Sequence, residues 1–244
     1  GDITYAGKYS EPDYEKIVDG ACNLAIESTM ILHTPEVKEQ LEKFGIHVLV
    51  DYSSYEPEPL GRTEWVKLYG LLTGHEAQAD KAFAEEKSAF EDVKNSVADE
   101  ADQEPKTVAF FYITSNGQAN VRKSADYLPK MIELAGGRYI FDSLGDEDDA
   151  TSTMSMQMEE FYAGAKDADY IIYNSTIEGE LSSVDDLLAK SPLFEKFKAV
   201  QEGHVYCTSK NLYQSTMSLG TITSDIRRML TGDDEDLTYI YKLE

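Results

Sequence analysis

Residues 23–52 read NLAIESTMILHTPEVKEQLEKFGIHVLVDY, and within them an amphipathic run separates two short apolar runs. The apolar runs, residues 23–27 and 47–52, have the length and composition of strands. Residues 35–44 have helical spacing, with Pro35 in the first turn after Thr34 and Gly45 beyond the end. A strand, a helix and a strand with short connections form the unit of a parallel sheet, so this stretch predicts an α/β fold.

The alternation continues along the chain. Residues 52–62 contain two prolines, a glycine and polar residues, which predict a loop, and residues 65–72 predict a helix. Residues 76–98 contain no Gly or Pro and carry one apolar stripe at helical spacing. They predict a helix about 33 Å long, which suits a strut between two lobes.

A polar, acidic segment broken by Pro105, residues 98–106, marks the predicted domain boundary. Beyond it the sequence predicts strands at residues 107–114, 139–141, 169–173 and 204–207, and helices at residues 121–134, 156–165, 192–200 and 221–230. We therefore predict a first lobe in residues 1–74, a connecting long helix and linker in 75–104, and a second lobe in 105–244. Each lobe is expected to hold a mainly parallel sheet flanked by helices.

The composition excludes several classes of function. Of the 244 residues 41% are hydrophobic, and 22 Lys and Arg against 46 Asp and Glu leave a net charge of −24. That charge repels nucleic acids and anionic membrane surfaces. No apolar run approaches the roughly 18 residues of a membrane helix. Cys22 and Cys207 have no metal-binding spacing and are expected to be small buried apolar residues.

Ligands of parallel sheets bind at the carboxyl ends of the strands. The predicted loops there are rich in Ser, Thr, Asn and Tyr, which hydrogen-bond polar ligands and stack on flat ones: residues 28–30, 52–55, 114–116, 174–176 and 209–211. Turn chemistry explains any one of these loops, whereas their recurrence favours a binding site. Arg62 and Arg122 are the nearest cations. Each pairs either with a carboxylate-bearing ligand or, structurally, with an acid such as Glu64 or Asp126.

Catalytic signals are weak. The sequence has no nucleophile elbow, no dinucleotide-binding glycine motif and no phosphate-binding loop, and its four histidines are scattered. Core or capping roles are favoured for His75 and His204, while His33 follows a predicted strand and remains a candidate ligand contact. We expect no enzyme activity, no resident cofactor and no dedicated metal site.

Short motifs over nearly the whole chain occur in the order of one known family. Pro12-Asp13-Tyr14-Glu15 is similar to a P-N-L-E turn that opens a helix, and residues 22–26 (CNLAI) are similar to the P-D-L-V-I strand that follows it. Further matches lie at residues 44–48 (FGIHV), 59–65 (PLGRTEW), 71–74 (LLTG), 135–141 (AGGRYIF), 167–172 (DADYII), 197–200 (FKAV) and 203–206 (GHVY). Together they resemble the periplasmic binding proteins of the iron-complex and cobalamin type.

This resemblance implies the substrate-binding component of an ABC importer, which captures a siderophore, haem or a corrinoid between two lobes and delivers it to a membrane permease. The ligand contacts it suggests at the strand-end loops are Met30, Tyr55, Arg62, Tyr112, Asn116, Arg122, Asn174 and Tyr213. It also implies docking on arginine pockets of the permease through one glutamate per lobe. These are Glu15 and Glu160, with Glu159 as the alternative to Glu160.

The family begins with a further strand–helix–strand portion before the Pro12 turn, so the resemblance implies an incomplete first lobe. Exposed apolar sheet edges there would favour self-association. The expected location is extracytoplasmic, either periplasmic or lipid-anchored, with a leader that is not in this chain. Two alternatives remain. One is a chelatase-like or metallocluster enzyme, for which His33 and Glu56 are the best candidate pair, and the other is an interaction module that binds no ligand.

Overall fold

The computed structural model describes residues 3–98, 104–145 and 152–244. The chain divides into two compact units, an N-terminal unit, Gly1–Glu56, and a C-terminal unit, Pro57–Glu244. This division falls after Glu56, ahead of the boundary expected from the acidic segment at residues 98–106. Most of that segment, residues 99–103, lies outside the described residues. The division into lobes at residues 1–74, 75–104 and 105–244 stays a prediction.

The N-terminal unit contains the strand–helix–strand stretch. Its elements are β1 (Gly7–Lys8), β2 (Glu11–Pro12), α1 (Tyr14–Asp19), β3 (Leu24–Ser28), α2 (Pro35–Lys43) and β4 (His47–Asp51), with 3₁₀ helices at Thr29–His33 and Ser53–Tyr55. Strands β3 and β4 pair in parallel, from Leu24 opposite His47 to Ser28 opposite Asp51. The predicted parallel unit is therefore confirmed, and α2 buries Val37 and Leu41 in its small core.

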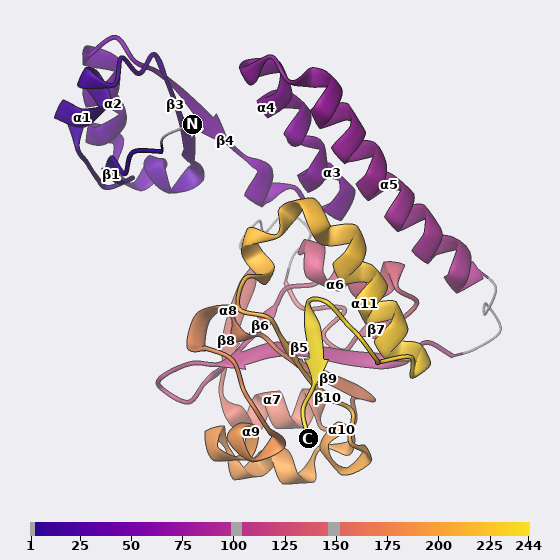
Figure 1. Cartoon of the computed structure of the whole chain (residues 1–244). Helices are drawn as coiled ribbons and strands as arrows, with labels where there is room; N and C mark the ends of the chain where they lie inside the picture. Colours follow the sequence, from indigo (N-terminus) through magenta and orange to yellow (C-terminus); the bar gives the residue numbers. More distant parts are fainter. Residues whose placement is uncertain (1–2, 99–103, 146–151) are drawn as a thin grey trace. The chain divides into compact units, whose positions relative to one another are not determined.

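The C-terminal unit is built on one mixed sheet (Figure 1). Its strands are β5 (Thr107–Ile113), β6 (Ala119–Arg122), β7 (Arg138–Tyr139), β8 (Thr153–Met156), β9 (Tyr170–Tyr173), β10 (Val205–Thr208) and β11 (Ile240–Lys242). They lie in the order β11-β10-β9-β5-β6-β8, and β7 pairs with β5. The pairings among β10, β9, β5 and β7 are parallel, whereas β6, β8 and β11 are antiparallel additions.

Helices cover both faces of this sheet (Figure 1). The α-helices in the described part of the C-terminal unit are α3 (Pro59–Glu64), α4 (Val66–Thr73), α5 (Glu76–Ala98), α6 (Tyr127–Leu134), α7 (Met158–Ala165), α8 (Ser175–Glu178), α9 (Val184–Lys190), α10 (Lys198–Glu202) and α11 (Leu219–Thr231). Further 3₁₀ helices lie at Pro192–Lys196, Leu212–Gln214 and Thr216–Ser218. Along β5, Val108 and Phe110 pack on the side of α6 and α11, while Ala109 and Phe111 pack on the side of α7 and α9. Burial on both faces explains why residues 107–114 are almost continuously apolar, and the mainly parallel α/β fold is confirmed.

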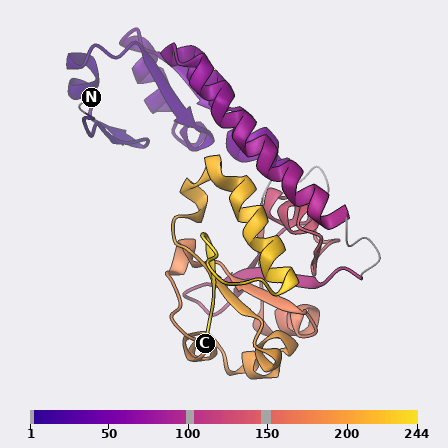
Figure 2. The same cartoon turned by 45° about the vertical axis from the view of Figure 1, so that its right-hand side comes forward.

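Helix α5 has the bounds expected from its composition, Glu76–Ala98. It runs beside α11 (Figures 1 and 2). The Gly220 N–H donates to the Glu86 carboxylate at 2.8 Å, and the Arg227 guanidinium donates to the Ser96 carbonyl at 3.0 Å. Within the C-terminal unit α5 is therefore a packed layer, and its role as a connection between lobes stays a prediction.

The helix predicted over residues 121–134 is wrong in its first part. Residues 119–122 form β6 instead, and α6 begins only at Tyr127, where the Asp126 carboxylate caps it through the Leu128 N–H at 3.0 Å. The cause is a tight turn after β5, closed by the Thr114 N–H on the Gln118 carbonyl at 2.9 Å, with Gly117 at φ +79°. An Asn-Gly pair between apolar runs is a hairpin signal, and it decides this local structure.

Other differences have local causes as well. Pro59 opens helix α3 inside the segment expected to be a loop, because proline is compatible with the first turn of a helix. The helix predicted at residues 156–165 begins two residues later, after β8. The one predicted at 192–200 is a 3₁₀ helix followed by α10, which are separated at Phe197.

The expectation that both cysteines are buried is wrong for Cys22. Cys22 is exposed in the turn after α1, where Ala21 has a φ of +51° and the Cys22 thiol contacts the Leu24 carbonyl at 3.3 Å. Cys207 is buried in β10, and neither forms a disulfide. Among the described residues, no helix combines the length and apolar character needed to cross a membrane.

Candidate functional site

Polar and aromatic side chains converge in the C-terminal unit where β5 and β9 end. We call this group the arginine–tyrosine cluster. It consists of Arg62, Arg122, Asp126, Tyr127, Asn174 and Tyr213. Four of these residues, Arg62, Arg122, Asn174 and Tyr213, were predicted as ligand contacts from the sequence.

Arg122 occupies the centre of the cluster because β6 holds its backbone in the sheet. It lies at the end of β6 and is only 7% exposed. The fully buried Tyr139 hydroxyl accepts the Arg122 N–H at 3.0 Å and donates to the Arg122 carbonyl at 2.8 Å. The backbone N–H and carbonyl of Arg122 are thus both hydrogen-bonded to the Tyr139 hydroxyl. These two bonds fix the position of the backbone from which the Arg122 side chain extends.

The Arg122 guanidinium forms a buried ion pair. Its Nη1 lies 3.3 Å from Oδ2 of Asp126, whose own exposure is 8%. Burial by itself would lower the pKa of the Arg122 guanidinium, but Tyr213 and Asp126 beside it raise that pKa above its ordinary value. Burial raises the pKa of Asp126, and Arg122 offsets part of that rise. The structural ion pair considered from the sequence is therefore present, with Asp126 as the partner.

Aromatic rings face both arginines. The guanidinium carbon of Arg62 lies 3.7 Å from the centroid of the Tyr127 ring, and that of Arg122 lies 4.9 Å from the centroid of Tyr213. At these distances the ring faces attract the cations. Burial raises the pKa of the Tyr127 phenol, so Tyr127 remains neutral beside the two cations. Tyr112 borders the cluster, and burial together with the nearby Tyr213 raises the pKa of its phenol.

Asn174 follows β9 and is 2% exposed. Its side-chain oxygen accepts the Thr176 N–H at 3.2 Å and the Thr176 hydroxyl at 2.7 Å, which leaves its amide nitrogen to donate elsewhere. That nitrogen donates to the Tyr213 hydroxyl at 2.8 Å, and Nη2 of Arg122 donates to the same oxygen. The cluster therefore presents two fixed donors that meet at one acceptor.

The remaining predicted contacts lie elsewhere. Asn116 is exposed in the β5–β6 turn, where its amide donates to the Gln118 side chain at 3.2 Å. Met30 and Tyr55 belong to the N-terminal unit and are 45% and 52% exposed. The predicted docking glutamates are exposed in the first turns of their helices, Glu15 in α1 and both Glu159 and Glu160 in α7.

Sequence reasoning did not identify Tyr127 or Tyr139 as members or supports of a site. Tyr139 acts on Arg122 across 17 residues of sequence through a backbone pair of hydrogen bonds. The Asn-Gly turn was the available signal, because it places Arg122 on a strand antiparallel to β5. Tyr127 follows the Asp126 cap, and its position over Arg62 has no sequence signature.

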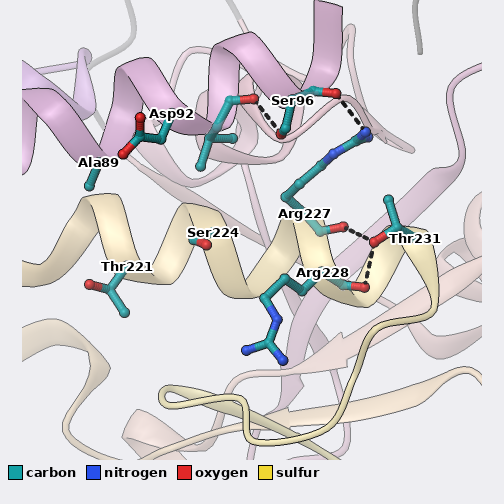
Figure 3. Close-up of a pocket in the computed structure, with 9 residues that line it drawn as sticks. Ala89, Asp92, Ser96, Thr221, Ser224, Arg227, Arg228 and Thr231 are labelled. Atoms are coloured by element: carbon teal, nitrogen blue, oxygen red, sulfur yellow. Dashed lines mark hydrogen bonds between the residues drawn. The ribbon is translucent and has the colours of Figure 1, made fainter. Parts of the chain in front are cut away.

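A separate groove lies between α5 and α11 (Figure 3). It has a volume of about 600 Å³ and is lined by Ala89, Asp92, Val93, Ser96, Thr221, Ser224, Arg227, Arg228 and Thr231. None of these belongs to the arginine–tyrosine cluster. Its two arginines point at protein groups, Arg227 at the Ser96 carbonyl and Arg228 at the Asp233 carboxylate, so the groove presents mainly small hydroxyl and alkyl groups.

Among the described residues, no group of three or more His, Cys, Asp or Glu side chains is arranged to hold a metal ion. His33 is exposed and Glu56 is partly buried. The ring of His204 stacks on Tyr170 with centroids 4.5 Å apart, and Nδ1 of His75 lies 2.8 Å from the Thr73 carbonyl.

A mainly parallel sheet with polar and aromatic groups at its strand ends is typical of α/β proteins that bind small ligands. The chain belongs to the periplasmic binding protein family, whose model matches residues 2–212. This confirms the family that the motifs resemble.

Two proteins of Methanocaldococcus jannaschii are similar in sequence, both described as uncharacterized lipoproteins. MJ0872 is 29% identical over 215 residues, and MJ0878 is 28% identical over 231 residues. The matches cover 85% and 92% of this chain. The chain spans about half the length of these relatives, 53% and 50%.

Solved structures share the fold. A periplasmic heme-binding protein from Pseudomonas aeruginosa aligns with a TM-score of 0.75 at 15% identity, over 98% of this chain and 83% of that one. The periplasmic heme-binding protein HutB of Vibrio cholerae aligns with a TM-score of 0.69 at 19% identity, over 90% and 82%. A possible iron-binding (periplasmic solute-binding) protein from Staphylococcus epidermidis also has a TM-score of 0.69, at 17% identity, over 91% and 81%.

Proposed function

We propose that this protein is the substrate-binding component of an ABC importer, which captures an iron complex between two lobes and delivers it to a membrane permease. The observation that carries the proposal is the family match over residues 2–212. The structural neighbours support it as well, because they are described as heme-binding or as possibly iron-binding proteins. The proposal assigns the protein no catalytic step, and the iron complex is its cargo.

The arginine–tyrosine cluster supports an anionic, flat ligand. It brings the guanidinium groups of Arg62 and Arg122 beside the rings of Tyr127 and Tyr213. Guanidinium groups bind carboxylate or catecholate oxygens through charge-assisted hydrogen bonds, and the tyrosine rings favour a planar surface. We propose a siderophore, haem or a corrinoid as ligand, with contacts from Met30, Tyr55, Arg62, Tyr112, Asn116, Arg122, Asn174 and Tyr213.

Permease docking and location complete the proposal. Glu15 and Glu160 are the proposed docking residues, and their exposure in first helical turns leaves both carboxylates accessible. An extracytoplasmic location, periplasmic or lipid-anchored, is supported by the family and by the relatives described as lipoproteins. Self-association through the sheet edges of the N-terminal unit is part of the proposal, because β3 and β4 form a two-stranded sheet among the residues that the structure describes.

Quenching of tryptophan fluorescence tests the proposal directly. Trp65 is the only tryptophan and directly follows α3, the helix that carries Arg62. The panel is haemin, cyanocobalamin, and ferric catecholate and hydroxamate siderophores, with correction for inner-filter absorption. We expect saturable quenching by one class at micromolar or lower concentration. If no member of the panel gave saturable quenching, the proposal would be contradicted.

A pair of lysine and arginine variants locates the binding site. Arg62→Ala removes the cation over Tyr127, and we expect it to weaken binding of the quenching ligand about tenfold or more, the scale of a charged hydrogen bond. Lys67→Ala is the matched control, because Lys67 lies 4.0 Å from the Phe83 ring in a similar cation–ring pair outside the cluster. Equal affinities of the two variants would remove Arg62 from the site.

A further inference from the structure

The Tyr213 hydroxyl lies where two buried donors meet. Nη2 of Arg122 and the side-chain nitrogen of Asn174 both donate to it, the latter at 2.8 Å. Arg122 is 7% exposed and Asn174 is 2% exposed, whereas Tyr213 is only partly buried. The donors thus belong to the interior of the unit, whereas Tyr213, which carries the acceptor, is partly exposed as a residue.

Other protein groups fix the positions of the two donors, the Arg122 guanidinium and the Asn174 side-chain amide. Asp126 binds the other side of the Arg122 guanidinium at 3.3 Å, and the Tyr139 hydroxyl binds the Arg122 backbone. The Asn174 N–H donates to the Phe111 carbonyl at 2.7 Å, and its side-chain oxygen caps α8. Neither donor depends on Tyr213 for its position.

The acceptor is attached differently. Tyr213 belongs to the 3₁₀ helix Leu212–Gln214, and the backbone bonds of this helix are local, such as Leu212 N–H to the Ser209 carbonyl at 3.1 Å and Gln214 N–H to the Asn211 carbonyl at 2.9 Å. A rotation of the Tyr213 side chain about χ1 would break no strand pairing, and its cost would be the packing of the ring against the core and over the Arg122 guanidinium. The two donors are thus fixed by the interior of the unit, whereas a short, locally bonded 3₁₀ helix carries the acceptor.

We propose that the Tyr213 hydroxyl occupies a two-donor subsite for one anionic oxygen, of the carboxylate type, and that Tyr213 withdraws when a ligand oxygen enters. A carboxylate oxygen accepts charge-assisted hydrogen bonds that are roughly twice as strong as those of a neutral acceptor. Buried donors left without an acceptor are costly, so withdrawal of the phenol requires a replacement. The subsite deepens the proposed function and rests on it only for the identity of the natural ligand.

Titration with acetate tests the subsite without any iron complex. The readout is the NMR signals of the Asn174 side-chain amide and the Arg122 Nε–H. Tyr213→Ala opens the subsite, and we expect acetate to shift both signals saturably, with at least tenfold tighter apparent affinity than in the unmodified protein. Gln214→Ala is the matched control, since Gln214 is an exposed neighbour in the same 3₁₀ helix. It is expected to respond like the unmodified protein.

A conservative variant guards against a folding defect. Tyr213→Phe keeps the ring and removes only the competing oxygen, so we expect at least twofold tighter acetate binding than in the unmodified protein. An unchanged or weaker response in both Tyr213 variants would overturn the subsite. Failure of the proposed function looks different, because the fluorescence panel would then give no saturation while acetate still titrates the Tyr213→Ala protein.

Discussion

Asp169 joins the starts of two neighbouring strands through one carboxylate. Its Oδ2 accepts the Thr107 N–H at 2.7 Å and the Thr107 hydroxyl at 2.9 Å, and its own N–H donates back to that hydroxyl at 2.9 Å. Its Oδ1 accepts from Nζ of Lys198 at 2.7 Å. Burial pushes the pKa of Asp169 upward, but the bonds from Lys198 and Thr107 outweigh it and lower the pKa to about 2.

Asp169→Asn should therefore destabilise the protein at neutral pH and much less in acid. The folded-state pKa lies below the ordinary 3.8, so the stabilisation is present above that value and is lost as the pH falls toward 2. Because the Lys198 side chain is 42% exposed, we expect a loss of only about 1 kcal/mol at pH 7. Urea unfolding of both proteins between pH 7 and pH 2 measures it. If the difference in unfolding free energy between the two proteins did not shrink in acid, the role of the charge would be contradicted. Asp167→Asn is the control, because the Asp167 side chain is 80% exposed.

At the scale of elements, the contact between α5 and α11 depends on a glycine. A Cβ at Gly220 would lie 2.7 Å from Cβ of Ala89 and 3.2 Å from the Glu86 carbonyl oxygen. The same close approach lets the Gly220 N–H reach the Glu86 carboxylate at 2.8 Å. Burial raises the pKa of Glu86, and this hydrogen bond offsets part of the rise.

Gly220→Ala should separate the two helices and lower the free energy of unfolding by about 1–3 kcal/mol, the usual range for overpacking. The closest atom that it meets is Cβ of Ala89, so Ala89→Gly is the matched second change. In a double-mutant cycle we expect a favourable coupling of roughly 1 kcal/mol between the two substitutions, measured by denaturant unfolding. Additive effects would show that the two sites are not in steric contact.

At the scale of the whole molecule, charge is the dominant feature. Subtracting 46 acidic from 22 basic residues leaves −24. Among the described residues, many of the ion pairs are exposed helical pairs such as Lys81–Glu85 and Lys87–Glu91, which contribute little to stability. Repulsion among the remaining carboxylates opposes the compact state and is screened by salt.

Raising NaCl from 0.05 M to 1 M should therefore stabilise the protein, by about 1 kcal/mol or more, which corresponds to roughly 2–4 °C in Tm for a chain of this size. Thermal unfolding followed by circular dichroism measures the shift. Sucrose of matched osmolality controls for effects that do not depend on charge. A Tm that falls or stays constant with salt would show that self-repulsion is not a significant cost in this protein.

What the sequence determined by itself is local. Apolar runs, helical spacing and caps predicted β3, α2 and β4, and the absence of Gly and Pro predicted both ends of α5. Such signals act within a few residues, so they can be recognised from the sequence alone. The ordered motifs also predicted the family that the comparison then matched over residues 2–212.

The Asn-Gly turn is a sequence signal for the strand at residues 119–122, but only the tertiary structure decided which strand it pairs with and what surrounds Arg122. A short apolar segment becomes strand or helix according to what it pairs with, and β6 exists because a turn folds it back onto β5. The partners of Arg122 are Asp126, Tyr139 and Tyr213, and the last lies 91 residues away along the chain. Contacts at such separations form only when the sheet brings distant strand ends together, because no local pattern specifies which side chains will meet there.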